Sequence, residues 1–312
     1  MSRLYLGVDG GQSSTTAIVG DETGRILGFG RGSECNHVKG PEGRTKFINA
    51  INGCIEKTGY HGATFEAACL GFSGGPADKE QLLKEMLHVS GAMTVTHDGL
   101  IALSGATAGA PGIITIAGTG SFCFGRNAEG RTARAGGWGY IFGDEGGGFD
   151  ITRQALRAAL RYEEGWGQPT ILHTMLLEAT GEKTANDLMH HCYTSDYPRP
   201  KIAAMSKLVD EAAENGDGIA RDILMAGAQQ LAGFTMALAS QLFKEGEPAF
   251  VAYIGGVYRS NLLRERFRML VELSDGITVG PPKFGPATGA LIEAYRSTGI
   301  NPPLSNLPES EK

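Results

Sequence analysis

LYLGVDGGQSSTTAIVGDETGRILGFG occupies residues 4–30, and GIITIAGTGSFCFGRNAEGRTARAGGWG occupies residues 112–139. Each stretch contains three short apolar runs, which favour strands, separated first by a Gly/Ser turn and then by a polar turn ending in Gly-Arg. Gly24-Arg25 corresponds to Gly130-Arg131, an offset of 106 residues, and the paired glycines of the first turn correspond to those at 118–120. An antiparallel meander that occurs twice predicts an internal duplication, with one copy in each of two domains.

The rest of the chain alternates between predicted helices and short strands, which is typical of an α/β fold. The first meander is followed by a helix over 42–58, a strand over 66–72, helices over 78–87 and 99–108, and a strand over 93–96. The second is followed by helices over 149–164, 170–179, 184–191, 200–215, 218–244, 260–273 and 287–298, with strands at AFVAYI and ITVG. We expect domains at 1–112 and 113–300, the last helix either staying in the second or packing back on the first, and a flexible tail over 301–312.

Composition narrows the class of protein. A chain of 312 residues with 41% hydrophobic content can bury a sizeable core, and its net charge of −6 indicates no nucleic-acid partner. Its five cysteines are odd in number and show no CxxC spacing, so neither a disulfide framework nor a zinc site is expected. No apolar run approaches the roughly 18 residues of a membrane span, and the N-terminus resembles no signal peptide. We expect a protein of the cytoplasm, without a membrane partner.

Both glycine turns are candidates for binding phosphate. Glycines between two strands can direct backbone N–H groups at an anion with no side chain in the way, although a single such turn is as readily an ordinary hairpin. Gly10 and Gly11 lie in the first turn, and Gly118 and Gly120 in the second. Neither turn matches the P-loop or the dinucleotide fingerprint. Since neither contains Lys or Arg, phosphate charge would fall to backbone N–H groups and a divalent cation.

Two aspartates follow predicted strands. Asp9 closes the first strand, beside a candidate phosphate turn, where a carboxylate is unfavourable unless Mg²⁺ lies between them. Asp98 lies between a short strand and a helix, where an ordinary helix N-cap is the alternative. The helix after Asp98 can return the chain from this aspartate to the second hairpin, so Asp98 is the candidate base for an attacking hydroxyl.

GGWGYIFGDEGGG, at residues 136–148, places an aromatic side chain and two carboxylates in a glycine frame. Trp138 as a packing anchor and Asp144 as a helix-start residue is one interpretation. The other is a sugar subsite, because carboxylates accept hydrogen bonds from neighbouring hydroxyls while an aromatic face covers the apolar side of the ring. Asn36, after the third strand, is a candidate amide partner in such a site.

In this order the motifs resemble the N-acetylglucosamine kinase family, which is grouped with BadF/BadG-type ATPases in the actin, Hsp70 and sugar-kinase superfamily. LGVDGGQSSTTAIV and GIITIAGTGSFCFG look like the family's two phosphate motifs, and HDGLIALSGA like its catalytic-aspartate segment. GGWGYIFGDEGGG looks like the sugar loop, AFVAYIGGVYRSN like the adenosine motif, and FGPATGALIEA like the closing helix motif. The likeness covers most of residues 4–296.

The resemblance implies two ribonuclease-H-like (actin-like ATPase) domains around a central cleft, which close over ATP and a small-molecule sugar. It implies transfer of phosphate to a sugar hydroxyl, usually that on carbon 6, with Asp98 as base and Asp9 organising Mg²⁺. The sugar contacts it implies are Asn36, Gly120, Ser121, Trp138 and Asp144. Besides the first hairpin, the nucleotide contacts it implies are Ser13, Thr119, Gly255 and Gly256.

The sequence leaves open whether the sugar is N-acetylglucosamine, glucosamine or N-acetylmuramic acid, and whether the chain forms a homodimer. Relatives in the same group also act as ATPase activators of iron-sulfur dehydratases and reductases, so a second class of function stays open. ADP production that depends on a sugar would separate a kinase from an activator.

Overall fold

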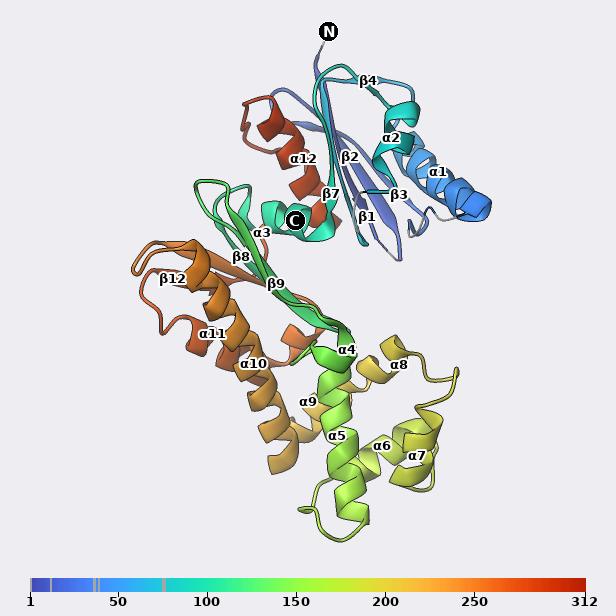
Figure 1. The fold of residues 1–312 in the computed structure, drawn as a ribbon, viewed down its shortest axis with the longest axis vertical. Coiled ribbons are helices and arrows are strands. Elements are labelled where there is room, and N and C mark those ends of the chain that lie inside the picture. Colours follow the sequence, from blue (N-terminus) through green and yellow to red (C-terminus); the bar gives the residue numbers. More distant parts are fainter. Residues whose placement is uncertain (1, 12, 36–37, 39, 75–76) are drawn as a thin grey trace. The chain divides into compact units, whose positions relative to one another are not determined.

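Each expected meander forms three strands of a five-stranded sheet in the computed structural model, which describes residues 2–11, 13–35, 38, 40–74 and 77–312 (Figure 1). The strand order is β3-β2-β1-β5-β7 in one sheet and β10-β9-β8-β11-β12 in the other. The first three strands are antiparallel neighbours in both sheets, and the last two run parallel to the central strand or to each other. The repeated order agrees with the expected duplication and confirms the α/β class.

The chain divides into unit 1, Met1–Ala110 with Pro282–Lys312, and unit 2, Pro111–Pro281. The strands of unit 1 are β1 (Leu4–Gly10), β2 (Thr15–Asp21), β3 (Ile26–Gly32), β5 (Ala67–Phe72) and β7 (Met93–His97), with a small pair β4 (Thr64–Phe65) and β6 (His88–Val89). Its helices are α1 (Gly40–Glu56), α2 (Glu80–Met86), α3 (Asp98–Thr107), α12 (Pro286–Ser297) and the short 3₁₀ turn η2 (Glu309–Glu311).

Helices cover both faces of the unit 1 sheet, which explains why β5 is buried along its whole length and why β1 has no polar residue before Asp9. Leu6 and Val8 of β1 face the core beneath α1, where they meet Phe47. Tyr5, on the opposite side of the same strand, packs with Leu291 of α12 in a second core. The sheet is therefore a rigid central layer, and its loops are positioned from both faces.

Unit 2 repeats the sheet with β8 (Gly112–Ala117), β9 (Ser121–Arg126), β10 (Thr132–Gly136), β11 (Ala249–Ile254) and β12 (Ile277–Gly280). Its helices are α4 (Gly139–Phe142), α5 (Gly148–Glu163), α6 (Leu172–Thr180), α7 (Ala185–His191), α8 (Arg199–Ala204), α9 (Ser206–Glu214), α10 (Gly218–Leu242), α11 (Asn261–Val271) and the 3₁₀ turn η1 (Gly256–Arg259). The expected single helix over 200–215 is two helices that join at Met205, and the four-residue α4 was not expected.

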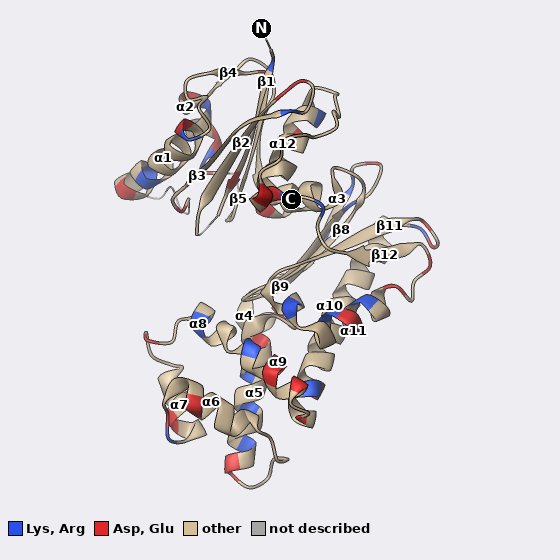
Figure 2. Ribbon diagram, turned by 180° about the vertical axis from the view of Figure 1, so that it is seen from behind, with Lys and Arg blue, Asp and Glu red and all other residues tan. Residues whose placement is uncertain are grey.

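α10 is long and apolar enough to cross a membrane by length and composition alone. Its buried residues, among them Leu224, Leu231 and Leu238, belong to the core of unit 2, so its apolar character serves packing. Acidic and basic residues lie together on the same elements, as along α1 and α5 (Figure 2).

At the C-terminus the structure has one of the two expected arrangements, in which the last helix packs back on the first domain. α12 belongs to unit 1 because it packs on β1 and α3, so the second unit ends at Pro281 instead of 300. The segment 301–312, expected to be flexible, is also held by unit 1. Ser305 bridges to Arg25, the Asn306 amide donates to the Ile26 carbonyl at 3.0 Å, and Glu311 is buried.

Candidate active site

The first glycine hairpin joins β1 to β2 and is held from outside by two other segments. The Gly11 N–H donates to the Ser14 carbonyl at 3.0 Å and closes the turn. The Cys35 N–H donates to the Gly11 carbonyl at 3.0 Å, and the Ser73 N–H donates to the Gly10 carbonyl at 3.2 Å. These bonds tie Gly10 and Gly11 to neighbouring segments of unit 1.

A basic side chain reaches this hairpin although none lies within its sequence. Arg31 of β3 donates from Nη2 to the Ser14 hydroxyl at 3.1 Å, and Ser13 beside it is exposed. The strand pattern could have indicated that Arg31 lies near the turn, because antiparallel pairing of β2 with β3 sets Arg31 opposite Thr16. The sequence expectation, which considered only the residues within the turn, did not include Arg31.

The two candidate aspartates of unit 1 lie at the same edge of the sheet. β1, β5 and β7 are parallel, and the carboxyl ends of parallel strands are where open α/β sheets bind ligands. Asp9 is the penultimate residue of β1, Ser73 directly follows β5, and Asp98 directly follows β7. The fold thus brings together residues that are up to 89 positions apart in the chain.

Asp98 is fixed by two hydrogen bonds, one to each carboxylate oxygen. The Ser73 hydroxyl donates to Oδ2 at 2.8 Å, and the Gly99 N–H donates to Oδ1 at 2.9 Å. The N-cap of α3 is His97, whose Nδ1 accepts from the Leu100 N–H at 3.2 Å. Asp98 is therefore not the ordinary N-cap that its sequence position allowed, and Ser73 is an orienting residue that the sequence analysis missed.

Asp9 carries an electrostatic strain that a cation would relieve. Burial, with Glu311 and Asp98 as nearby like charges, raises the pKa of Asp9 to about 7. Glu311, from the C-terminal segment, accepts from the Thr288 N–H at 2.9 Å and hydroxyl at 3.1 Å at the start of α12, and burial raises its pKa as well. A half-buried carboxylate with acidic neighbours fits the expected Mg²⁺ role.

No group of three His, Cys, Asp or Glu side chains with metal-binding geometry occurs among the described residues. Asp9 would therefore supply one protein ligand, and the other ligands would come from water and phosphate. Mg²⁺ commonly binds in this way, since it keeps several waters and takes one or two carboxylates together with substrate phosphates.

The second hairpin joins β8 to β9 in unit 2 and is supported by the start of α5. The Gly118 N–H donates to the Gly120 carbonyl at 2.9 Å across the turn. The Gly148 and Phe149 N–H groups donate to the Gly118 and Thr119 carbonyls at 2.8 and 3.0 Å. The first turn of α5 thus fixes the hairpin tip by main-chain bonds, as Cys35 and Ser73 fix the tip in unit 1.

Asp144 is buried against this hairpin. The Ser121 N–H lies 3.4 Å from its Oδ1, and the Ser121 hydroxyl donates to the Glu145 carbonyl at 2.6 Å. A side chain at Gly120 would place its Cβ 2.4 Å from Asp144 Oδ2, so glycine is required there for the carboxylate to approach. Three of the predicted sugar contacts, Gly120, Ser121 and Asp144, therefore form one cluster.

Trp138 lies at the edge of the same loop with 71% of its surface exposed. The Arg134 guanidinium lies 5.2 Å from the centre of its ring and donates to the Gly137 carbonyl at 3.0 Å. The next apolar residues, Ile141 and Phe142, are also exposed. Trp138 is thus exposed and is not a buried packing anchor.

Arg199, the first residue of α8, forms an ion pair with Asp144. Nothing in the sequence indicated this partner, because 55 residues separate the two positions. The guanidinium also lies 5.1 Å from the ring centre of Tyr140 and 5.9 Å from that of Phe149. Asp144 is therefore a compensated carboxylate, unlike Asp9.

Gly255 and Gly256 follow β11, beside a cavity of about 300 Å³ within unit 2. Gly255 has a φ of +115°, and a Cβ there would lie 2.3 Å from the Ala117 carbonyl oxygen, so only glycine fits against the end of β8. The cavity is lined by Ile151, Ser206, Lys207, Asp210, Leu224, Gly256, Val257, Arg259 and Ser260. Its mixed apolar and polar lining has the size and character for part of a nucleoside.

The predicted residues therefore fall into two clusters. Unit 1 holds Asp9, Gly10, Gly11, Ser13 and Asp98. Unit 2 holds Thr119, Gly120, Ser121, Trp138, Asp144, Gly255 and Gly256. Asn36 lies outside the described residues.

Comparison with known proteins agrees with this arrangement. A model of the BadF/BadG/BcrA/BcrD ATPase family matches residues 6–294. An N-acetylmuramic acid/N-acetylglucosamine kinase from Clostridium acetobutylicum is 32% identical over 300 residues, which cover 94% of this chain and 98% of that protein. An N-acetyl-D-glucosamine kinase from Dictyostelium discoideum is 29% identical over 314 residues, covering 94% and 98%.

Solved structures show the same fold. A Chromobacterium violaceum structure assigned as an N-acetylglucosamine kinase has a TM-score of 0.68 at 25% identity, covering 93% of this chain and 98% of that chain. A ROK family glucokinase from Streptomyces griseus, solved with glucose and AMPPNP, has a TM-score of 0.53 at 21% identity, covering 93% and 98%. The fold is that of the actin-like sugar kinases, and with a family match across both sheets the chain belongs to the BadF/BadG/BcrA/BcrD ATPase family.

Proposed function

We propose that this protein transfers the γ-phosphate of ATP to a hydroxyl of an amino sugar such as N-acetylglucosamine, at carbon 6. The observation that carries the proposal is the fixed carboxylate of Asp98 at the strand edge that also presents Asp9 and the first hairpin. The curated relatives that match most of the chain are kinases of N-acetyl amino sugars. The chain is accordingly an ATP-dependent phosphotransferase with an alcohol acceptor.

The proposed base is Asp98. Its Oδ2 and Oδ1 each already accept one hydrogen bond, and each oxygen keeps a further lone pair for the hydroxyl proton of the sugar. The sugar oxygen forms a bond to the γ-phosphorus while the bond from that phosphorus to the β–γ bridging oxygen breaks, and ADP leaves. The proton of the hydroxyl passes to Asp98.

Phosphate charge would be met by both glycine hairpins, with Ser13 and Thr119 beside them, and by Arg31 in unit 1. Mg²⁺, held through Asp9, would neutralise charge on the phosphate oxygens. The cavity beside Gly256 would take the adenosine. Arg31 was not among the phosphate-binding residues expected from the sequence.

The sugar would contact Asn36, Gly120, Ser121, Trp138 and Asp144. The cluster around Asp144 supports this role, because it combines a carboxylate acceptor with the hydroxyl of Ser121 and the exposed face of Trp138. All five cysteines are free thiols, in keeping with a cytoplasmic location.

The activator function lacks comparable support. Cys123, the cysteine within the second meander, is fully buried in β9, and burial raises its thiol pKa to about 12. A thiol must be deprotonated to bind iron, so this residue is a poor cluster ligand.

ADP release with a panel of amino and neutral sugars tests the proposal. We expect ADP to form in proportion to added N-acetylglucosamine, and ³¹P–¹H correlation spectra of the product to place phosphate on carbon 6. Steady ATP hydrolysis that no sugar accelerates would contradict the kinase function and favour the activator. Phosphate on another carbon would contradict only the position.

A further inference from the structure

Arg199 is the exposed member of its pair with Asp144. The Arg199 side chain is 36% exposed, whereas that of Asp144 is 8% exposed. The guanidinium therefore covers the carboxylate, so any ligand that reaches Asp144 also meets Arg199. Arg199 Nε is buried and has no hydrogen-bond partner among the described residues, so the side chain keeps unused donor capacity.

Aromatic rings define the position of Arg199. The guanidinium lies 5.1 Å from the ring centre of Tyr140 and 5.9 Å from that of Phe149, and these two rings contact each other edge to face at 5.3 Å. Cations are attracted to the faces of aromatic rings, and the planar guanidinium suits this better than an ammonium. A Lys at this position would keep the charge but lose the planar fork.

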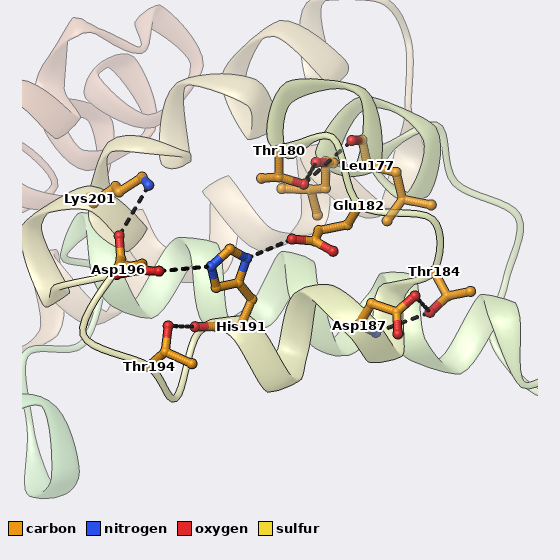
Figure 3. Close-up of polar contacts among 10 residues, drawn as sticks. Leu177, Thr180, Glu182, Thr184, Asp187, His191, Thr194, Asp196 and Lys201 are labelled. Carbon is orange, nitrogen blue, oxygen red and sulfur yellow. Dashed lines mark hydrogen bonds and ion pairs between the residues drawn. The ribbon is translucent and has the colours of Figure 1, made fainter.

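A second network anchors the segment that precedes α8 (Figure 3). His191 lies between Glu182, 2.6 Å from its Nδ1, and Asp196, 3.7 Å from its Nε2. Lys201 donates to the Asp196 carbonyl at 3.1 Å. The two carboxylates around His191 thus hold the segment that leads into α8, the helix that begins with Arg199.

We propose that Arg199 makes the sugar subsite sensitive to the charge on the amino sugar, and that the site accepts N-acylated sugars that are neutral or carry a carboxylate while discriminating against a free ammonium. This inference rests on the proposed kinase function and adds a substrate class to it. It concerns three sugars on one ring framework: glucosamine as a cation, N-acetylglucosamine as a neutral molecule and N-acetylmuramic acid as an anion.

The physical reason is charge compensation. Asp144 alone would place a negative charge in the subsite and attract an ammonium group, but the Arg199 pair brings the local charge close to zero. An ammonium then loses its water without gaining an ion pair. A carboxylate can instead accept from the exposed guanidinium, a charge-assisted interaction for which Arg is suited.

The test compares kcat/KM for the three sugars in wild type, Arg199→Gln and Arg199→Lys, at a pH below the pKa of the glucosamine amine. For Arg199→Gln we expect the rate with glucosamine, relative to N-acetylglucosamine, to rise about tenfold, and that with N-acetylmuramic acid to fall about tenfold. Arg199→Lys should keep most of the glucosamine discrimination and lose part of the muramic acid rate. Raising the salt concentration should reduce these differences, because exposed charges are screened.

Lys201→Gln is the matched control. Lys201 lies on the same helix, its recorded partners are the Asp196 carbonyl and the Tyr197 ring, and its substitution also removes one positive charge. We expect unchanged ratios among the three sugars.

Two outcomes overturn the inference while leaving the proposed function intact. One is an equal loss of activity with all three sugars in Arg199→Gln, which would mark Arg199 as merely structural. The other is the same change of ratios in Lys201→Gln, which would indicate a long-range field rather than a contact. If wild type phosphorylates none of the sugars, the proposed function itself fails.

Discussion

The two halves of this protein have the same sheet topology but differ in the charges around the carboxylate at the glycine hairpin. In each, a glycine hairpin follows the central strand and is held by main-chain hydrogen bonds from another segment. In unit 1 the carboxylate at the hairpin, Asp9, has Glu311 and Asp98 as charged neighbours, and its pKa rises to about 7. In unit 2 the carboxylate at the hairpin, Asp144, is paired with Arg199.

Under the proposed function, this difference in charge assigns the metal and the sugar to different units. A negative cluster calls for a cation from outside, which suits a half that organises Mg²⁺ and a proton acceptor. A carboxylate paired with an arginine can accept hydrogen bonds from neutral hydroxyls and has less attraction for a metal ion. This suits a unit that binds a sugar. Substitutions at the residues of both sites test this difference, beginning with the largest expected effect.

Asp98→Asn should lower kcat by about 10³-fold, because an amide cannot take the hydroxyl proton. ATP affinity should stay within about twofold, since no hairpin residue changes. Steady-state kinetics measure kcat, and calorimetric titration with a non-hydrolysable ATP analogue measures the affinity. Near-normal turnover would show that Asp98 is not the base.

Ser73→Ala should lower kcat less than Asp98→Asn does. It removes the hydroxyl that donates to Asp98 at 2.8 Å but leaves the carboxylate and its bond from Gly99. We expect about a tenfold fall in kcat, as for the loss of one orienting hydrogen bond. A loss as large as that of Asp98→Asn would indicate that Ser73 has a direct chemical role.

The same substitution should have opposite effects on stability in the two units. Asp9→Asn should stabilise unit 1 by about 1–2 kcal/mol at pH 8, because it removes a partly buried carboxylate whose charged form is unfavourable. Since burial and like charge raise the folded pKa of Asp9 from 3.8 to about 7, the unfolded state loses its proton first as pH rises. The gain should therefore grow between about pH 4 and 7, stay constant above, and vanish at lower pH.

Asp144→Asn should instead destabilise unit 2, because it leaves Arg199 beside an amide. We expect about 1 kcal/mol, a small value because the Arg199 side chain is 36% exposed and water screens the pair. Thermal midpoints of both variants across the same pH range measure the contrast. Two shifts of the same sign at pH 8 would remove the electrostatic distinction between the units.

The sequence predicted most of the fold because its signals were local. The strands of both meanders and the helices around them agree with the structure to within a few residues, since apolar runs and glycine turns are short-range features. The residues brought together by tertiary contacts were harder to predict. Arg199 pairs with Asp144 across 55 positions, and Ser73 meets Asp98 across 25, with no sequence pattern that links either pair.

The C-terminal segment is the clearest case of a misleading local signal. NPPLSNLPESEK is polar and rich in proline, a composition typical of disorder. One buried carboxylate, Glu311, nevertheless attaches it to the first turn of α12, which begins at Pro286 after an N-cap glycine that has no side chain to accept a hydrogen bond. The segment supplies this missing acceptor from 23 residues away.

Glu311→Gln should therefore have a small, double effect in unit 1. It keeps an oxygen for Thr288, and because burial raises the pKa of Glu311, loss of the charge should raise the thermal midpoint slightly at neutral pH. It also removes the largest like charge near Asp9, so the pKa of Asp9 should fall from about 7 toward its ordinary value. Because the proposed Mg²⁺ ligand is the ionised form of Asp9, the midpoint pH below which kcat/KM for MgATP declines should move down by about 0.5 to 1.

Glu309→Gln is the control for the tail, because Glu309 is 87% exposed and its recorded side-chain partner is Lys312. We expect it to change neither the thermal midpoint nor the pH profile. If Glu311→Gln lowers the thermal midpoint but leaves the pH profile in place, Glu311 serves only as a helix cap. The raised pKa of Asp9 would then come from burial and from Asp98, without Glu311. The contrast between the units would be that Asp9 and Asp98 have no basic partner in this argument, whereas Asp144 is paired with Arg199.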